Sequence, residues 1–429
     1  MTSESNFAAL GLHPAVARAL ADAGYTRPTE VQARAIPAAL QGRDLMVSSA
    51  TGSGKTAAFV VPALERVLAA RAAAAPPRST GPRVLVLTPT RELALQVARA
   101  ATTYGRHVPG LRVASVVGGV PYGLQLRQLR GPLDLLIATP GRLLDHLGSG
   151  KAQLGQVELL VLDEADRMLD MGFIDDIRAI VEQTPPARQT LMTSATFAGH
   201  VGRLAQQLLR EAERIEVDSH TERHEHITQR LHWADDFAHK NALLDHILTE
   251  RDVEQVLVFT STQRDADRLA DRLAEFGHKV AALHGAMPQG RRNRTLAALR
   301  RGELRVLVAT DVASRGIDVP AISHVVNYGL PMKAEDYVHR IGRTGRAGRQ
   351  GLAVTLAERM DAHMIRRIQQ FTTQRIPVAT IAGLEPKRPE PSAARGQPPV
   401  RARKPGRPAP APFRPRAVRP RTAGSRWAE

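Results

Sequence analysis

Ser48-Ser49-Ala50-Thr51-Gly52-Ser53-Gly54-Lys55-Thr56 follows the short apolar run Leu45 to Val47 and precedes a segment of helical periodicity. Glycines in such a loop let the backbone curl so that its N–H groups point at phosphate oxygens. Lys55 can then reach the β and γ phosphates, and the Thr56 hydroxyl can bind Mg²⁺. The loop predicts a phosphate site, although Ser49 stands where the general pattern has glycine; a glycine-rich turn that caps a helix is the alternative.

A second apolar run, Leu159 to Leu162, ends directly in Asp163-Glu164-Ala165-Asp166. A strand that ends in carboxylates puts Asp163 at the carboxyl edge of a parallel sheet, where it can hold the water shell of Mg²⁺. Glu164 is then placed to orient or deprotonate an attacking water. Alone, these four residues also fit a solvated helix face. After a phosphate loop they favour a nucleotide-hydrolysing site.

Short β-rich apolar runs alternate with longer segments of helical periodicity through the chain. This alternation is typical of βαβ units around mostly parallel sheets. A length of 429 residues with 43% hydrophobic content indicates two cores rather than one. The runs include Leu45 to Val47, Val84 to Leu87, Leu159 to Leu162, Val256 to Phe259, Val306 to Val308 and His324 to Val326.

The boundaries between the parts of the chain follow from changes in composition. The polar segment Glu216 to Thr228 interrupts the alternation and predicts a linker. The stretch Ala69 to Pro82, rich in Ala, Pro and Arg, predicts an extended surface loop. We therefore expect a first domain over residues 1–217, a linker over 218–226, a second domain over 227–383 and a tail over 384–429.

The net charge of +17 is concentrated at the C-terminal end. Residues 387–429 contain twelve Lys or Arg against Glu390 and Glu429, so they carry +10 and residues 1–386 carry +7. With its scattered prolines, this tail cannot bury enough apolar surface to fold alone and is predicted to be disordered. Basic residues laid against phosphates release counterions, which makes nucleic acid the leading partner. A solubilising surface is the alternative, and for the tail so is an extension without a binding role.

Several classes of protein are excluded or disfavoured. The chain has no cysteine, so it can form neither disulfides nor cysteine-ligated metal sites. Residues 1–7 lack a basic segment followed by an apolar run, and no apolar stretch approaches membrane-spanning length. The sequence predicts a soluble cytoplasmic protein with no membrane partner.

With Asp163 to Asp166 identified, the chain resembles the DEAD-box ATP-dependent RNA helicases over residues 7 to about 380, with the matching segments in family order. The resemblance implies an α/β fold of two tandem RecA-like parallel-sheet domains, of the P-loop NTPase type found in helicase superfamily 2, followed by the basic tail. The short N-terminal segment, compact core and basic tail are similar to the bacterial branch represented by RhlE.

The resemblance implies ATP and Mg²⁺ as cofactors. Gly24 to Gln32 is similar to the adenine-recognition motif of the family, in which both faces of the Gln32 amide can bond the adenine edge. One of Phe7 and Tyr25 is expected to stack on or support the adenine, with core packing the alternative for both. The expected nucleotide-binding residues are Phe7, Tyr25, Arg27, Gln32, Thr51, Gly52, Ser53, Gly54, Lys55, Thr56, Gly316 and Asp318, and Thr56 and Asp163 are expected to hold Mg²⁺, partly through water.

Three segments of the first half resemble the RNA-backbone contacts of the family. They offer N–H groups, hydroxyls and guanidinium groups suited to phosphate, with no array that would distinguish base edges. The resemblance therefore implies RNA binding that is independent of sequence. Together with one residue of the second half, the expected RNA-binding residues are Pro89, Thr90, Arg91, Gly118, Gly119, Thr139, Pro140, Gly141, Arg142 and Thr310.

The second half lacks a phosphate loop and resembles the remaining motifs of the family. Ala286 is a departure, because the family commonly carries an acid there. His339 to Arg346 is similar to the arginine-finger motif, in which Arg343 and Arg346 neutralise charge that develops on the γ-phosphate. The segments that carry this resemblance are Val258 to Ser261, His284-Gly285, Gln289, Arg292, Ala309 to Asp318 and His339 to Arg346.

The implied roles divide into catalysis and coupling. The expected catalytic residues are Lys55, Asp163, Glu164, Arg343 and Arg346. The residues expected to couple the state of the nucleotide to RNA binding are Asp166, Ser194, Thr196 and His339, with the Ser194 and Thr196 hydroxyls bonded to Asp166.

The resemblance implies an RNA-stimulated ATPase that couples ATP binding and hydrolysis to local, non-processive unwinding of RNA duplexes or remodelling of ribonucleoprotein. Ribosomal or RNA-decay proteins are then further expected partners. An ATP-dependent RNA clamp or assembly scaffold would use the same residues and stays open. A DNA translocase is disfavoured by Gln32 and His339, and an RNA-binding protein with an inactive ATPase fold would require the loss of Lys55, Glu164 or Arg343.

Overall fold

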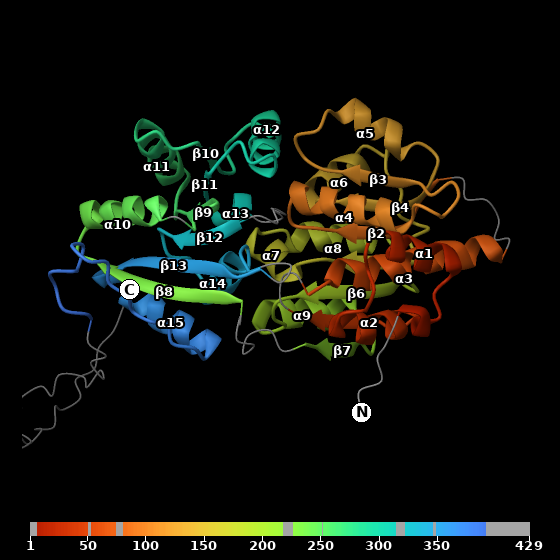
Figure 1. The fold of residues 1–429 in the computed structure, drawn as a ribbon. Helices are drawn as coiled ribbons and strands as arrows, with labels where there is room; N and C mark the ends of the chain where they lie inside the picture. The colour runs from red at the N-terminus through yellow and green to blue at the C-terminus, as the bar shows by residue number, and fades with distance from the viewer. Residues whose placement is uncertain are drawn as a thin grey trace, which may run out of the picture. The chain divides into compact units, whose positions relative to one another are not determined.

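The computed structural model describes residues 7–49, 53–73, 80–217, 226–250, 252–314, 322–345 and 349–391. Residues 1–390 form one compact unit. Two parallel sheets organise it, one in each half of the chain (Figure 1).

The first sheet has seven strands in the order β3-β4-β2-β5-β6-β1-β7. All its pairings are parallel, so each strand is connected to the next by a crossover, and the carboxyl ends of the strands lie along one edge. The strands are β1 (Leu45–Ser48), β2 (Gly81–Leu87), β3 (Val113–Val116), β4 (Pro132–Ala138), β5 (Leu159–Leu162), β6 (Gln189–Ser194) and β7 (Glu213–Glu216).

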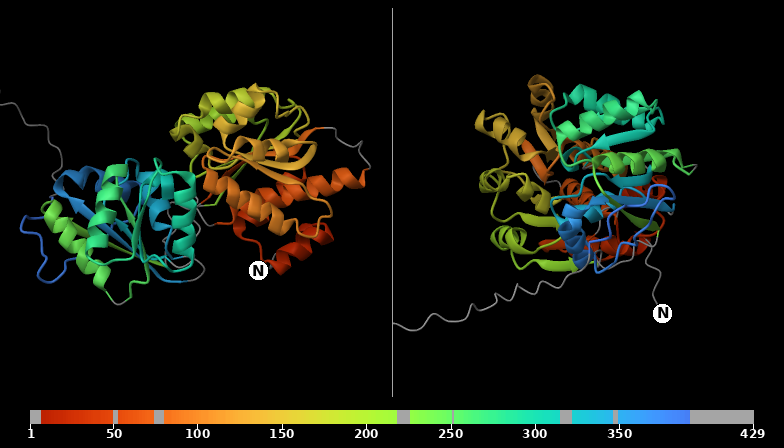
Figure 2. Two further views of the ribbon diagram at one scale, coloured as in Figure 1. Left: turned by 90° about the horizontal axis from the view of Figure 1, so that it is seen from above. Right: turned by 90° about the vertical axis from the view of Figure 1, so that its left-hand side faces the viewer.

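Helices cover both faces of this sheet (Figures 1 and 2). Val84 and Val86 pack into one core, whereas Leu85 and Leu87 pack into the other. Burial on both faces explains why the strands are continuous apolar runs. One core includes α1 (Pro14–Asp22), α2 (Glu30–Leu40), α3 (Lys55–Ala72) and α4 (Arg91–Tyr104), and the other includes α6 (Pro140–Gly148), α7 (Ala165–Asp170), α8 (Ile174–Glu182) and α9 (Gly199–Leu208).

The second sheet has six parallel strands in the order β10-β11-β9-β12-β13-β8. Its helices also divide between two faces. The strands are β8 (Ile227–Ala234), β9 (Gln255–Phe259), β10 (Val280–Leu283), β11 (Val306–Ala309), β12 (Ile322–Asn327) and β13 (Gly351–Glu358). One face carries α10 (Phe237–Thr249) and α11 (Gln263–Glu275), and the other carries α12 (Gln289–Arg300), α14 (Ala334–Ile341) and α15 (Ala362–Thr372).

The predicted α/β architecture is confirmed, and each quoted apolar run lies within a strand. The predicted loop over Ala69 to Pro82 is wrong at both ends. The helix α3 continues to Ala72, because Ala and Arg are strong helix formers, and β2 already begins at Gly81. Residues 74–79 of this segment lie outside the described residues.

Both predicted boundary segments lie only partly within the described residues. Residues 218–225 of the linker and 392–429 of the tail are outside them. The tail is predicted to begin at residue 384, but Leu384 packs against the core of the second half. Asp235 accepts hydrogen bonds from the backbone N–H groups of Lys387 (2.7 Å) and Arg388 (3.1 Å). Residues 384–388 are therefore attached to the second sheet's domain.

None of the helices in the described ranges combines the length and apolar character that crossing a membrane requires.

His232 in β8 couples the stability of the second domain to pH. The residue is 4% exposed, and within the described part of the chain its Nδ1 has no hydrogen-bond partner. Burial, with a smaller contribution from Arg230, lowers the pKa of His232 from 6.5 to about 4. The folded protein thus keeps the ring neutral, whereas the unfolded chain binds a proton below pH 6.5. Stability is therefore lost as the pH falls from 6.5 to about 4.

We predict that this group costs about 2 kcal/mol of the free energy of unfolding at about pH 5 relative to pH 7.5. His232→Gln should remove that part of the pH dependence, and His363→Gln, at an exposed position, should keep it. Urea unfolding followed by tryptophan fluorescence, to which the neighbouring Trp233 contributes, measures both variants. An unchanged acid slope in His232→Gln would contradict the assignment.

Candidate active site and RNA interface

Except for Gly24 to Gln32, which precede the first strand, the sequence motifs of the first half follow strands and lie along the carboxyl edge of the first sheet. The strand order divides them into two groups. The loops after β3, β4 and β2 carry the residues expected to bind RNA, and the loops after β5, β6 and β1 carry those expected to bind or hydrolyse ATP or to couple its state to RNA. The topology therefore places two functions side by side on one edge of one rigid sheet.

Gln32 connects the segment that precedes the first sheet to the phosphate loop through hydrogen bonds. Its side chain is fully buried, its Nε2 donates to the Gly54 carbonyl (3.2 Å), and its Oε1 accepts from the Thr29 N–H (3.0 Å). Gly54 caps α3 with φ +93°, and a Cβ there would lie 2.3 Å from Nε2 of Gln32. Only glycine permits both this backbone conformation and this close contact.

Ser49 stands where the general phosphate-loop pattern has glycine, and its polar contacts are with residues of the loop and the start of α3. Its hydroxyl lies 2.8 Å from that of Ser53, and its carbonyl accepts a hydrogen bond from Lys55 Nζ (2.5 Å). Lys55 and Thr56 form the first turn of α3, beside Ser53 and Gly54. Thr51 and Gly52 lie outside the described residues.

Burial lowers the pKa of Lys55, and the carboxylates of Glu164, Asp163 and Asp166 oppose that shift. These four groups therefore act on one another electrostatically, as expected of one site. The loop after β1 and the end of β5 meet because β6 is the only strand between them.

Asp163 is a buried carboxyl group at the end of β5. Its Oδ1 accepts a hydrogen bond from the Thr193 hydroxyl (2.6 Å), and the same hydroxyl oxygen accepts from the Glu164 N–H (3.0 Å). Burial, reinforced by the charge of Glu164, raises the pKa of Asp163 to about 7. Because a divalent cation would offset this cost, the donor set fits a Mg²⁺ held by one carboxylate, the Thr56 hydroxyl, phosphate and water.

Glu164 has a left-handed backbone, with φ +55° and ψ +56°. This conformation is uncommon for a residue with a side chain, and residues that hold it often belong to functional sites. Here it turns the chain from β5 into α7 directly after Asp163. The strain supports the expected catalytic role of Glu164.

The turn after β6 contacts Asp166 through its backbone. The Ala195 N–H donates to Asp166 Oδ2 (3.2 Å), although hydroxyl donors were expected. The Ser194 hydroxyl instead donates to the Thr196 carbonyl (2.6 Å) and accepts from the Thr196 N–H (3.2 Å). Short polar side chains readily form hydrogen bonds within their own turn. The turn therefore still contacts Asp166, but the donor is a backbone N–H and not a hydroxyl.

The aromatic residues expected near adenine form a cluster. Phe7 is buried and meets Tyr25 edge-on at 6.2 Å, and Tyr25 meets Tyr104 edge-on at 5.4 Å. The hydroxyls of Tyr25 and Tyr104 lie 2.7 Å apart, and burial raises the pKa of Tyr104. Phe7 therefore supports the segment from inside the core, while Tyr25 is half-buried and Arg27 is exposed.

Arg91 lies against the glycine pair after β3. A Cβ on Gly119 would lie 2.3 Å from Arg91 Nη1, and one on Gly118 would lie 3.1 Å from Nη2. Burial lowers the pKa of Arg91. The two glycines are thus required for the guanidinium to occupy this position.

The remaining expected RNA-binding residues start helices or end strands. Arg142 Nη1 donates to the carbonyl of Val120 (3.0 Å), which joins the loop after β4 to the loop after β3. Thr310 follows β11, on the carboxyl edge of the second sheet. Thr90 caps α4, Thr139 caps α6, Pro140 and Gly141 begin α6, and Pro89 follows β2.

Side chains from the two halves of the compact unit also contact each other. Glu92 Oε1 accepts from Arg292 Nη2 (2.7 Å), and Arg91 Nη1 donates to Gln289 Oε1 (2.8 Å). Both Glu92 and Arg292 are nearly buried. The Gln289 and Arg292 segment therefore meets the edge that carries the expected RNA-binding residues.

The expected arginine-finger segment begins in α14 (Ala334–Ile341), and Arg343 follows the end of that helix. Arg343, at 8% exposed, donates from Nε to the His339 carbonyl (3.2 Å). Both residues line a cavity of about 10 Å³ together with Arg167, which follows Asp166 directly in sequence. Arg346, Gly316 and Asp318 lie outside the described residues.

Three residues without a predicted role stand out in the structure. Arg340, 2% exposed, binds both oxygens of Asp311 at 2.6 and 2.7 Å and lies 4.8 Å above the Phe259 ring. Arg167 Nη1 donates to Asp336 Oδ1 (2.6 Å). Gln125 holds three backbone groups of the loop after β3. Only Arg340 had a signal in the sequence, since it stands inside the arginine-finger segment.

The phosphate loop at a helix N-terminus, the carboxylates that directly follow β5 and the sheet covered on both faces define a P-loop ATPase. A family model described as DEAD/DEAH box helicase matches residues 29–204, and one described as helicase conserved C-terminal domain matches residues 239–348.

Relatives support the same class. The chain is 42% identical over 390 residues to the ATP-dependent RNA helicase SrmB of Escherichia coli (strain K12), covering 90% of this chain and 86% of SrmB. It is 41% identical to the ATP-dependent RNA helicase DeaD of Mycobacterium tuberculosis (strain ATCC 25618 / H37Rv), covering 89% of this chain and 66% of that protein. The chain belongs to the DEAD-box family of ATP-dependent RNA helicases.

Solved structures extend the comparison. The fold matches S. cerevisiae Dbp5 bound to RNA and ADP BeF3 with a TM-score of 0.78, 30% identity and coverage of 87% of this chain and 96% of that one. It matches Mss116p bound to single-stranded RNA and AMP-PNP with a TM-score of 0.79, 28% identity and coverage of 89% and 81%.

We predict that Arg340→Met lowers the free energy of unfolding by about 3 to 5 kcal/mol, because it leaves the Asp311 carboxylate without its bidentate partner. Arg367→Met, on an exposed position of α15, should change stability little. Urea unfolding of both variants at pH 7.5 measures the difference, and equal midpoints would show that the buried pair does not stabilise the domain.

Proposed function

We propose that the chain is an RNA-stimulated ATPase that uses ATP binding and hydrolysis to separate short RNA duplexes or remodel ribonucleoprotein locally. The division of the first sheet's edge carries this proposal: phosphate loop and carboxylates on one side, glycines and guanidinium groups on the other. Because the two sites share one sheet, a ligand at either can bias the arrangement that the other requires.

In this proposal the chain's own residues divide the chemistry of hydrolysis. Lys55 and the loop N–H groups bind the phosphates, and Asp163 with Thr56 would hold the Mg²⁺, which neutralises phosphate charge when bound. Glu164 orients the attacking water and takes its proton. Arg343 and Arg346 stabilise charge on the γ-phosphate from the second domain. Arg343 already lines the same small cavity as Arg167, which supports this assignment.

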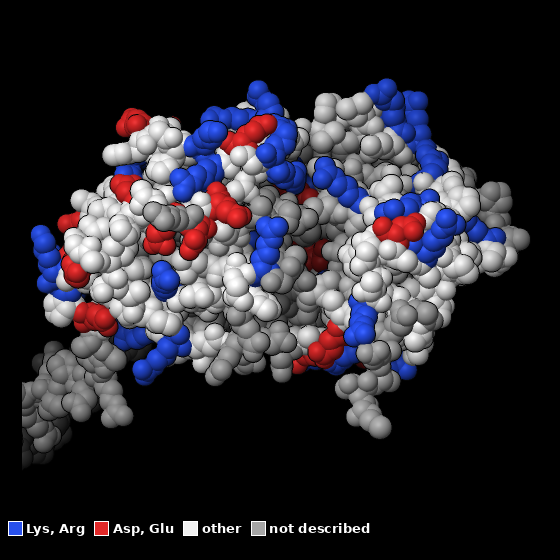
Figure 3. All heavy atoms as spheres, in the orientation of Figure 1, with Lys and Arg blue, Asp and Glu red and all other residues white. Residues whose placement is uncertain are grey.

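RNA is proposed to bind through its backbone, without base recognition. The candidate contacts are guanidinium groups, hydroxyls and helix starts, which suit phosphate. Figure 3 shows basic side chains gathered over α12, whose first turn includes Gln289 and Arg292. This basic surface supports a path for an RNA strand because it lies beside Arg91 and Glu92, which contact residues of α12.

Coupling between the ligands follows from thermodynamics. If ATP and RNA both bind more tightly to one arrangement of the two domains, each must raise the affinity of the other. Asp166, the turn over residues 194–196 and His339 are the proposed links between the sites. Loss of the γ-phosphate then weakens that arrangement and releases RNA.

The choice between helicase and scaffold, the subfamily, the location, the domain boundaries and the protein partners are further parts of this proposal. The relatives named SrmB and DeaD support a helicase over a scaffold that clamps RNA without unwinding it. We further propose the RhlE-like branch, a cytoplasmic location, domain boundaries near residues 217 and 227, and ribosomal or RNA-decay proteins as partners. Strand displacement on a short RNA duplex, compared with a DNA duplex of the same sequence, tests the helicase proposal directly.

Glu164→Gln should bind ATP and RNA but hydrolyse about 10² to 10⁴ times more slowly, the range expected for loss of a general base. Because hydrolysis precedes release in the proposed cycle, RNA should dissociate more slowly from the ATP-bound variant. Glu182→Gln, which makes the same change at an exposed position, is the control. Stopped-flow release of labelled RNA measures this, and normal release from Glu164→Gln would contradict the cycle.

Arg343→Ala should keep ATP affinity within a few-fold and lower RNA-stimulated kcat by about 10³-fold or more, as expected for an arginine finger. Arg366→Ala, on an exposed position of α15, should leave kcat unchanged. Steady-state ATPase assays with saturating RNA compare the two. An unchanged kcat in Arg343→Ala would overturn the finger assignment.

A further inference from the structure

The loop after β3 has structural support on one side only. Because β3 is the edge strand of its sheet, residues 117–120 have a neighbouring strand on the β4 side alone. There, the Thr139 N–H donates to the carbonyl of Val116 (3.1 Å). On the open side no strand offers backbone partners, so the position of the glycine pair requires another constraint.

Gln125 of α5 (Tyr122–Leu129) supplies that constraint. Its Oε1 accepts from the Val117 N–H (3.0 Å), and its Nε2 donates to the carbonyls of Val117 (3.1 Å) and Val120 (3.0 Å). The pair of bonds to Val117 reproduces what a neighbouring strand would offer. The side chain is 1% exposed, so an unmade bond here would leave a buried polar group unsatisfied.

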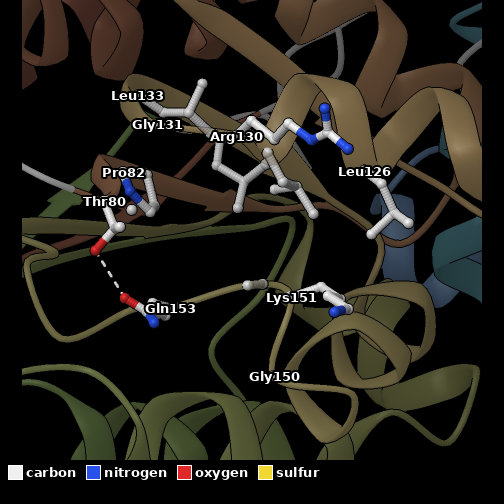
Figure 4. Close-up of a pocket in the computed structure, with 13 residues that line it drawn as sticks. Thr80, Pro82, Leu126, Arg130, Gly131, Leu133, Gly150, Lys151 and Gln153 are labelled. Carbon is white, nitrogen blue, oxygen red and sulfur yellow. Dashed lines mark hydrogen bonds between the residues drawn. The ribbon is translucent and has the colours of Figure 1, made fainter.

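Few apolar contacts hold α5 itself. All eight residues of α5 are described, and Gln125 is the only buried one among them. Leu124 is 45% exposed, whereas Leu129 is partly buried and packs against the core of the first domain. Leu126 and Leu129 also line a cavity of about 290 Å³ that reaches the starts of β2 and β4 (Figure 4). Polar contacts therefore contribute to where α5 and the preceding loop lie.

Three further contacts tie this unit to α6 and to Ser149, which follows it. The ring of Tyr122 stacks on His146 with centroids 4.2 Å apart, and its hydroxyl lies 2.7 Å from that of Ser149. Arg142 Nη1 shares the Val120 carbonyl with Gln125. The loop after β3 and the start of α6 thus form one polar framework.

Two guanidinium groups lie against this framework. Arg91 lies against Gly118 and Gly119 and donates to Gln289 Oε1 (2.8 Å), and Arg142 is bonded to the Val120 carbonyl. A shift of residues 117–120 would change the surroundings of both groups. The hydrogen bonds of Gln125 go to the loop backbone, so its effect on RNA is expected to pass through the loop.

We infer that Gln125 is a positioning residue for RNA binding, which holds the glycine loop so that Arg91 and Arg142 present their guanidinium groups to the RNA backbone. This inference rests on the proposed function. It predicts an effect on RNA affinity that is separate from nucleotide binding, because the ATP residues follow β5, β6 and β1 on the other side of the edge.

The test compares Gln125→Met, which keeps the side-chain length but removes all three hydrogen bonds, with Gln128→Met at an exposed position of the same helix. Gln125→Met should raise the Kd and KM for single-stranded RNA about tenfold, the scale of losing one to two net hydrogen bonds. The KM for ATP without RNA, and kcat at saturating RNA, should stay within about twofold. Gln128→Met should change none of them.

Gln125→Glu separates positioning from a general loss of structure. Its carboxylate can still accept from the Val117 N–H, but it has no donor for the carbonyls until it is protonated, and then it has a single O–H. Its RNA affinity should therefore improve toward wild type as the pH is lowered from about 8 to about 6, relative to Gln128→Glu. A defect that does not depend on pH would indicate a structural role only and overturn the inference.

The outcomes distinguish the inference from the proposed function. Tight RNA binding by the wild type with an equal Kd for Gln125→Met overturns the inference alone. No RNA binding by the wild type overturns both. Equal losses of RNA and ATP affinity in Gln125→Met, or a large drop in its melting temperature, would also overturn the inference, because the damage would then extend beyond the loop.

Discussion

Parallel strand pairing is the constraint on which this protein depends. Parallel strands need crossover helices, so every loop that leaves a strand at its carboxyl end emerges along the same edge. In the first domain this brings six loops from residues 49 to 196 into one row. The order of the strands in space, rather than in sequence, then sorts them into loops proposed to bind nucleotide (the nucleotide half) and loops proposed to bind RNA (the RNA half). The two groups of loops are neighbours on this edge.

Burial gives the nucleotide half its chemical character. Burial raises the pKa of Asp163 and of Asp166, and the charge of Glu164 adds to both shifts. The same burial lowers the pKa of Lys55, because it disfavours the charged form of the ammonium group. Such a cluster suits a cation and a triphosphate, whose charges would balance it. The left-handed backbone of Glu164 shows that local conformational energy is also given up to build the site.

The RNA half depends on polar positioning more than on packing. Its loops are short, its outermost strand is an edge strand, and α5 buries a glutamine where a helix usually buries leucine. Hydrogen bonds are directional, so Gln125 and Arg142 can fix loop geometry in a region without a dense apolar core. The second domain uses the same approach, with Arg340 holding Asp311, Asn327 and Gly329 around one guanidinium.

The sequence by itself determined the α/β class, the two domains, the phosphate loop and the acidic strand end, because these depend on local periodicity and on residues adjacent in the chain. The structure alone decided which distant groups meet. Thr193 on Asp163, the Ala195 N–H rather than a hydroxyl on Asp166, and Gln125 on Val117 each join residues whose spacing carries no periodic signal. The end of α3 at Ala72 and the attachment of Leu384 were also misjudged from composition. Such contacts depend on how strands are ordered and how helices pack, and only the folded chain specifies that.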